Sequence, residues 1–253
     1  MIISLINMSD GAVSDSLLQC AVRAVNRQIA EDFSPYWGFG AQVRLEGKSG
    51  RRRRDVDPAD MRGDAILYLR KNTDLVDAEG FHDRHFSGIP YGFVFLDLSE
   101  ALGEEWSVTL SHEALELIGD PQANLLVRGP HPGDRRRDVF HWFEMCDAVQ
   151  SEAYKIDGVP VSNFVLPLYF TSSNERGGRN DFLGTIPPDG QTLRSFSTNP
   201  GGYIGFFDPK KQEDVTWSLD DDAHGRKRLK LKHDLHVGRG QRRRRPRSEP
   251  EAT

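Results

Sequence analysis

The segment Ser107–Pro121, SVTLSHEALELIGDP, places one histidine and two glutamates at a spacing suited to metal chemistry. On a helix, residues i and i+4 lie on the same face, so His112 and Glu116 would present two ligands to one ion. Glu113 lies one step around that helix, where its carboxylate would hold the water that such an ion activates. The three residues therefore predict a metal-dependent catalytic site with Glu113 as its general base.

A catalytic zinc ion takes three protein ligands and keeps a fourth position open for water. The third ligand must come from beyond this helix, and the segment FHWFEMCDAV supplies Glu144 and Asp147. The apolar spacing within Asp138–Glu152 is compatible with a short helix, which would place both carboxylates on one face. Either of them could be the ligand, and His141 and His131 are the alternatives.

The ligand types indicate which cofactor to expect. One histidine with two carboxylates forms a harder and more negative site than two histidines with one carboxylate, so manganese or calcium competes with zinc. Extra anionic ligands also weaken the pull of the ion on its water, whose pKa then stays above the ~7 reached in efficient zinc hydrolases. We expect zinc as the cofactor and slow hydrolysis.

Apolar patterns predict the elements that position these residues. Strands are expected at Ile2–Asn7, Ala41–Leu45, Ala65–Arg70 and Tyr91–Leu98. Helices are expected at Ser14–Asp32 and Thr109–Asp120. Pro35 and the glycines after it are expected to end the first helix, and residues 71–90 are expected to form a long loop.

The second half of the chain has weaker patterns. Tyr154–Phe170 predicts a hairpin around the turn dipeptide Asp157-Gly158. The segment PGDRRRD around Pro132 predicts a surface loop, and Thr171–Asp208 is expected to be irregular because it is rich in Gly, Ser, Asn and Pro. We therefore expect an α+β protein with an N-terminal subdomain (1–121), an irregular C-terminal subdomain that completes the site (122–223) and a tail (224–253).

Composition limits the class of protein. With 37% apolar residues, 9% aromatic residues and four Trp in 253 residues, the chain is typical of a soluble globular protein. No signal peptide is expected at the N-terminus, and no window approaches the ~18 apolar residues that a membrane-spanning helix needs. Two cysteines, Cys20 and Cys146, imply no disulfide framework. The expected location is the cytoplasm.

The charge is divided unevenly along the chain. Residues 224–253 contain eleven Lys and Arg against three Asp and Glu, a net +8, so the total of −5 leaves −13 for the first 223 residues. The tail has few apolar residues and is expected to be disordered. It could bind an acidic partner or nucleic acid without specificity, although an acidic body is not typical of a dedicated nucleic-acid-binding domain.

The order of these elements around His112 resembles the zincin-like metallopeptidases, over about the first half of the chain, and is similar to bacterial and phage proteins of this type. In that superfamily a mixed sheet with a backing helix precedes an active-site helix that carries H-E-x-x-H. The resemblance implies that Tyr91–Leu98 is the strand on the substrate side. Here the motif reads H-E-x-x-E, because position 116 is Glu, and Gln122 stands where a metzincin would supply a third histidine.

The resemblance also implies roles for further residues. Gly119 falls where metzincin-type members keep a glycine after the helix, and Met145 could be the methionine that lies under the metal. Tyr91 or His82 would stabilise the oxyanion. These expectations describe a metallopeptidase that acts on a peptide or protein substrate. The alternative is a noncatalytic scaffold of the same fold, whose carboxylates bind a structural ion or form salt bridges.

Overall fold

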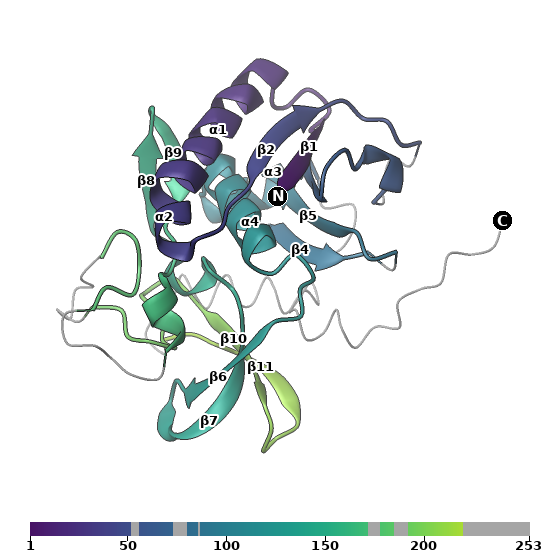
Figure 1. The fold of residues 1–253 in the computed structure, drawn as a ribbon. Helices are drawn as coiled ribbons and strands as arrows, with labels where there is room; N and C mark the ends of the chain where they lie inside the picture. The colour runs from purple at the N-terminus through teal and green to yellow at the C-terminus, as the bar shows by residue number, and fades with distance from the viewer. Residues whose placement is uncertain (52–55, 73–79, 86, 172–177, 185–191, 220–253) are drawn as a thin grey trace.

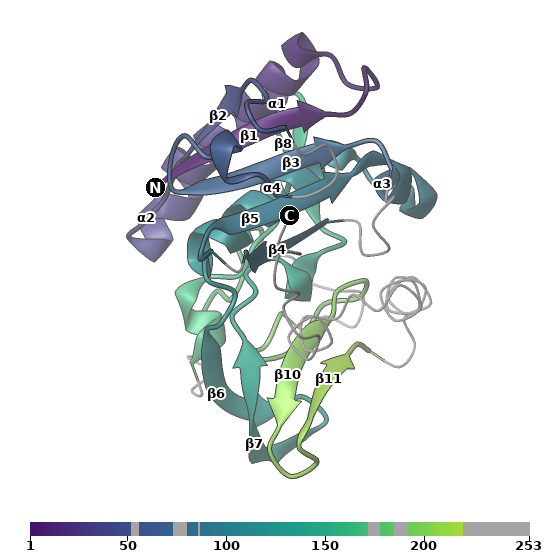
Figure 2. The same cartoon turned by 90° about the vertical axis from the view of Figure 1, so that its right-hand side faces the viewer.

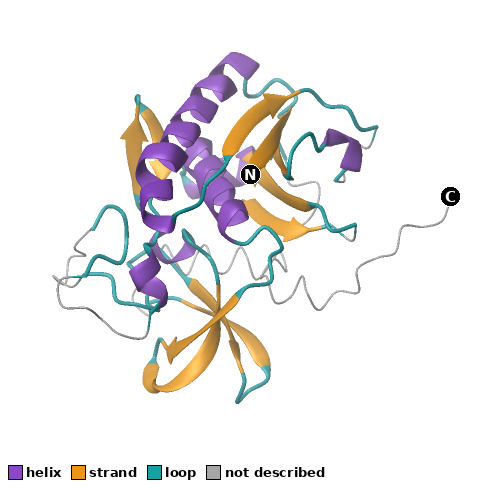
Figure 3. Cartoon of the chain, in the orientation of Figure 1, coloured by secondary structure: helices purple, strands orange, loops and turns teal. Residues whose placement is uncertain are grey.

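The structure, a computed structural model, describes residues 1–51, 56–72, 80–85, 87–171, 178–184 and 192–219. Within these ranges the chain is an α+β protein with a five-stranded sheet, a four-stranded sheet and a two-stranded hairpin (Figure 3). No described helix has the length and apolar character needed to cross a bilayer. The predicted tail lies outside the described residues.

The five-stranded sheet is mixed. Its strand order is β2-β1-β3-β5-β4. The strands span Gln42–Glu46 (β2), Ile2–Met8 (β1), Ala65–Arg70 (β3), Pro90–Phe95 (β5) and Gly80–Arg84 (β4). The first four are parallel to one another, and β4 runs antiparallel to β5 at the edge. The strands predicted from the apolar runs of β1, β2 and β3 are confirmed to within one residue at each end.

Two expectations about the region before helix α4 (Trp106–Gly119) need correction. The segment predicted as a loop contains β4, which has no alternation of apolar and polar residues by which it could have been predicted. The strand predicted over Tyr91–Leu98 is confirmed only as far as Phe95, because β5 ends there and Leu96 begins helix α3 (Leu96–Leu102). β5 lies between β3 and β4, so it is not at the edge of the sheet. The outer strand beside α4 is therefore β4.

The first helix, α1 (Asp15–Arg27), begins where predicted, because the Ser14 side chain accepts a hydrogen bond from the Leu17 N–H. The prediction that Pro35 ends it at Asp32 is wrong. A π-helical segment, Gln28–Phe33, continues into the short helix α2 (Ser34–Trp37), which ends at Gly38 with φ of 73°. Pro35 lies in the first turn of α2, directly after the π-helical segment.

Both long helices pack on the same face of the mixed sheet. Figures 1 and 2 show α1 and α4 (Trp106–Gly119) side by side against it, with α4 nearer β4 and β5. The main core lies between them and includes Leu18, Leu67, Val94 and Leu115. A second core cluster, which contains Tyr68 and Phe93, lies on the other face. The position of α4 brings its polar side chains beside the edge of the sheet.

The Asn26 side chain links α1 to β2 by two hydrogen bonds. Its Nδ2 donates to the Val43 carbonyl and its Oδ1 accepts from the Val43 N–H, each at 2.8 Å. We expect Asn26→Ala to lower the free energy of unfolding by about 1–3 kcal/mol, because two partly buried backbone groups lose their partners. Urea denaturation would measure this, with the exposed Gln19→Ala on the same helix as control. Equal midpoints for the two variants would contradict the prediction.

The second half of the chain is more regular than expected. Its four-stranded antiparallel sheet has the order β11-β10-β7-β6. The strands span Glu213–Trp217 (β11), Ile204–Asp208 (β10), Asp134–Trp142 (β7) and Leu126–His131 (β6). The sheet lies below the mixed sheet in Figure 1. The C-terminal subdomain is therefore not wholly irregular, since β10 lies within residues expected to lack regular structure.

Three further predictions for this half have different outcomes. A helix over Asp138–Glu152 is wrong, because β7 continues to Trp142 and only Asp147–Val149 form a single 3₁₀ turn. The surface loop around Pro132 is the turn between β6 and β7, and its arginines lie on β7. The hairpin is confirmed as β8 (Ala153–Ile156) and β9 (Val159–Ser162). Asp157 and Gly158 form its turn with φ of 51° and 82°.

Candidate metal centre

Helix α4 carries three charged or titratable side chains into the interior of the protein. His112, Glu113 and Glu116 are each only 4% exposed. Most of α4 is buried, and a helix of that kind is ordinarily apolar on all sides. A buried carboxylate is costly unless it is paired or bound to a metal. The three residues on α4 therefore require partners, and other elements supply them.

His112 lies between two carboxylates. Its Nε2 is 3.3 Å from Glu116 Oε1 and 3.3 Å from Asp147 Oδ1. A charge-assisted hydrogen bond is shorter, at ~2.7–2.9 Å. Two ligands of a tetrahedral zinc ion, each bonded at ~2.0–2.1 Å, lie about 3.3 Å apart. His112 Nε2 thus has two carboxylate oxygen atoms at the distance that separates neighbouring ligands of one divalent ion.

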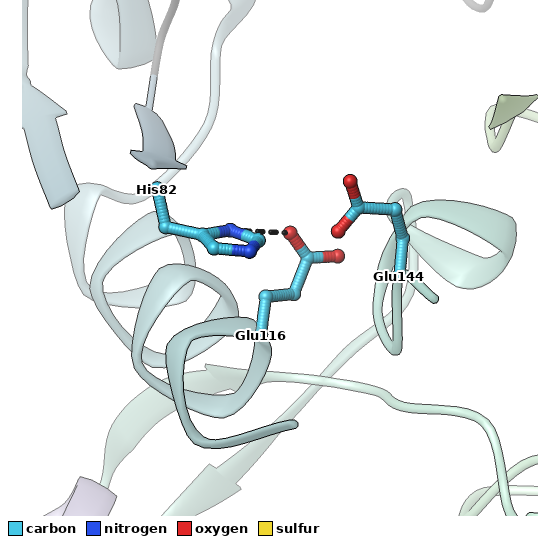
Figure 4. A group of neighbouring side chains, drawn as sticks. All are labelled: His82, Glu116 and Glu144. Atoms are coloured by element: carbon cyan, nitrogen blue, oxygen red, sulfur yellow. Dashed lines mark ion pairs between the residues drawn. The ribbon is translucent and has the colours of Figure 1, made fainter. Parts of the chain in front are cut away.

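His82 approaches the same carboxylate from the other side. It lies on the edge strand β4 opposite Gly92 of β5, and its side chain is 2% exposed. Its Nδ1 is 3.6 Å from Glu116 Oε2 and 3.9 Å from Glu113 Oε2. Figure 4 shows His82, Glu116 and Glu144 directed toward one another from three separate segments. Glu116 is thus the carboxylate that both histidines share.

The loop after β7 supplies the remaining carboxylates. One ligand atom each of His82, Glu116 and Glu144 lie within 4.8 Å of one another, as do those of His112, Glu113 and Glu116. The Cys146 N–H donates to Glu116 Oε1 at 3.2 Å and so fixes this loop against α4. The sequence predicted both Glu144 and Asp147 as candidate ligands. The loop after β7 brings them to the centre, and they do not share one face of a helix.

A close contact at the end of α4 holds the loop in place. Met145 is fully buried, and a Cβ atom at Gly119 would lie 2.4 Å from Met145 Cε. Only a glycine at position 119 allows the Met145 side chain to pack so closely against the last turn of α4. This packing places Glu144 and Cys146, the residues on either side of Met145, beside Glu116 of α4.

The electrostatics of the centre follow from burial and from the pairing of opposite charges. Burial lowers the pKa of His112, but Glu116 and Asp147 outweigh it and raise that pKa well above its usual value. Burial raises the pKa of Glu116, but His112 outweighs it and holds that pKa well below its usual value. Burial raises the pKa of Cys146, which therefore remains a thiol. The centre thus offers nitrogen and carboxylate oxygen atoms as metal ligands.

Three of the residues considered in the sequence lie elsewhere. Tyr91 packs on Phe93 with ring centroids 5.6 Å apart, in the core cluster on the sheet face opposite α4. His141 Nε2 lies 2.9 Å from the Pro130 carbonyl, and burial lowers the pKa of this histidine to about 4. His131 Nδ1 accepts two backbone N–H groups in the turn after β6. The structure does not bring these three residues to the centre.

A pocket adjoins the centre on the side of the second sheet. Glu144 and Asp147 line it together with the aromatic side chains of Trp142, Tyr169 and Phe170. A molecule in this pocket would therefore touch two carboxylates of the centre and an aromatic wall. The pocket has a volume of about 10 Å³, room for about one water molecule, and none of the described residues that line it belongs to α4.

His82, which the resemblance places at the oxyanion, lies in the centre, on a strand that the sequence did not predict. The segment GFHDRHF has no pattern that predicts this strand. Comparisons with protein families, with curated proteins and with solved structures find no match for this chain.

Proposed function

We propose that this protein is a metal-dependent hydrolase with a zincin-like fold that cleaves peptide bonds. The observation that carries the proposal is the cluster of His112, Glu113 and Glu116, whose ligand atoms lie within 4.8 Å of one another, with Asp147 Oδ1 3.3 Å from His112 Nε2. The mixed sheet supports the likeness to zincins, because its antiparallel edge strand runs beside the helix that carries the H-E-x-x-E motif.

The residues fit a divalent cation. Glu113 Oε2 is buried and has no hydrogen-bond partner within the described residues. An unsatisfied buried carboxylate oxygen costs free energy that an ion or its water would recover. His112, Glu116 and Asp147 would hold the ion, with zinc expected and manganese as its competitor. When bound, the ion supplies polarisation of a substrate carbonyl and lowers the pKa of a water molecule.

Glu113 supplies the acid–base chemistry. Its carboxylate accepts a proton from the attacking water and later donates that proton to the leaving amine, the two roles of a general base and acid. Its burial excludes bulk water, which would otherwise weaken these proton transfers. The edge strand β4 supports a peptide as substrate, since an extended chain can hydrogen-bond to the outer strand of a sheet.

Removal of metal should destabilise the protein. Protein purified without an affinity metal is expected to contain at least one equivalent of transition metal per chain. Dialysis against a chelator should lower the thermal midpoint by roughly 5–10 °C, because an ion present at ~100 times its Kd contributes about 2.7 kcal/mol. Elemental analysis and calorimetry would measure both. A metal-free preparation whose midpoint is unaffected by chelator or added zinc would rule out the proposal.

The raised pKa of His112 supports a second candidate, a noncatalytic scaffold whose histidines and carboxylates form buried ion pairs. In that case the protonated imidazole of His112 would occupy the place of the cation. Such a protein would bind no metal and would have the same thermal midpoint with and without zinc. The chelation experiment therefore separates the two candidates.

A further inference from the structure

We propose that the centre holds two divalent cations, with Glu116 as the carboxylate that bridges them. The inference rests on the metal binding proposed above and extends it by a second site. It does not depend on the substrate or on whether the reaction is peptide hydrolysis.

The two oxygen atoms of Glu116 face different histidines on different elements. Oε1 lies 3.3 Å from His112 Nε2 of α4, and Oε2 lies 3.6 Å from His82 Nδ1 of β4. Two-metal sites hold their ions ~3.5–4 Å apart, a separation that a carboxylate can bridge with one oxygen on each ion. Glu116 therefore divides the centre into two halves that share it.

Each half has a histidine and a further carboxylate of its own. The first half contains His112 Nε2, Glu116 Oε1 and Asp147 Oδ1. The second contains His82, Glu116 and Glu144, with ligand atoms within 4.8 Å of one another. Each half thus offers three ligands, the number that a catalytic divalent site uses before water completes its coordination.

The formal charge of the carboxylates in the centre is compatible with two divalent cations. Within the described residues, Glu113, Glu116 and Asp147 form no ion pair with Lys or Arg, and Glu116 and Asp147 pair with histidines. A single divalent ion would leave these three carboxylates with a net charge of −1, and Glu144 adds a fourth carboxyl group. The formal charge of two divalent ions equals that of the four carboxylates.

Glu113 provides an independent indication. Its Oε2 is buried, has no hydrogen-bond partner within the described residues and lies 3.9 Å from His82 Nδ1. Glu113 also has a ligand atom within 4.8 Å of those of His112 and Glu116, so its carboxylate lies between the two halves of the centre. An ion beside His82, or a water molecule on it, would satisfy Glu113 Oε2.

Metal stoichiometry tests the proposal. The full chain, stripped with chelator, would be titrated with Mn²⁺ by calorimetry and, in parallel, with Zn²⁺. We expect two equivalents per chain for the unaltered protein with at least one of the ions. Frozen samples with two Mn²⁺ should give the broad electron paramagnetic resonance signal of an exchange-coupled pair in place of the six-line signal of an isolated ion.

Variants separate the two halves. His82→Ala should lower the stoichiometry from two to one and restore the six-line signal, and His112→Ala should also leave one ion. His131→Ala is the matched control, because His131 bonds within the turn after β6, and it should keep two ions. Circular dichroism would verify folding, and His82→Gln replaces His82→Ala if the latter does not fold.

The outcomes distinguish this inference from the proposed function. If the unaltered protein binds only one equivalent of metal in the Mn²⁺ titration and only one in the Zn²⁺ titration, the second site is overturned. The proposed enzyme would then be mononuclear. The second site is also overturned if His82→Ala retains two ions, because it would then not use His82. No binding of either ion overturns both proposals.

Discussion

Replacement of Glu116 by glutamine is expected to remove metal from the protein and to abolish hydrolysis. Glu116 contacts both histidines of the centre and accepts a hydrogen bond from the Cys146 N–H. An amide presents one neutral oxygen where the carboxylate presents two charged ones, so both histidines lose their shared partner. The affinity should fall by more than the ~10–100-fold that loss of an outer-shell partner causes.

Elemental analysis after gel filtration and a calorimetric titration would measure this loss. The control is Glu100→Gln, the same chemical change at an exposed position on α3. It should bind metal as the unaltered protein does. If Glu116→Gln retained a full complement of tightly bound metal, the centre described above would not be the site of binding.

Glu113→Gln should separate chemistry from metal binding. The glutamine has the size of the glutamate but cannot accept a proton, so kcat should fall by ~10²–10⁴-fold, the usual contribution of a general base. The metal content should stay unchanged, since His112, Glu116 and Asp147 remain. Hydrolysis of a panel of fluorescence-quenched peptides, with metal analysis of the same sample, would test both statements.

Two results would assign Glu113 a different role. Unchanged turnover would show that another group accepts the proton. Loss of metal together with activity would show that Glu113 is itself a ligand. Because the carboxylate of Glu113 lies 3.9 Å from the ring of His82, the second result would place it in the half of the centre beside β4.

The sequence predicted the elements whose pattern is local. β1 and β3 are continuous apolar runs, and the stripe of α1 recurs every three or four residues, so each could be recognised without knowledge of its neighbours. The turn at Asp157 and Gly158 is specified by two adjacent residues. The i,i+4 relation of His112 and Glu116 was predictable for the same reason, because it needs only one helix.

The remainder of the centre depends on contacts between distant segments. β4 is held by its register with β5, which sets His82 opposite Gly92, and no pattern within GFHDR indicates this pairing. The spacing of Phe140, Phe143 and Asp147 is that of a helix, yet pairing with β6 and β10 extends the first part of this segment as a strand. Tertiary hydrogen bonds thus overrode the local periodicity.

The hydrogen bonds between Asn26 and Val43 have a consequence for how copies of this protein meet. A strand from a neighbouring molecule that approached β2 would have to displace an amide that already occupies the Val43 backbone groups. Edge-to-edge polymerisation needs two accessible sheet edges on every molecule, and the Asn26 side chain of α1 occupies backbone groups at one of these edges. The mixed sheet should therefore resist growth into ordered fibrils through β2.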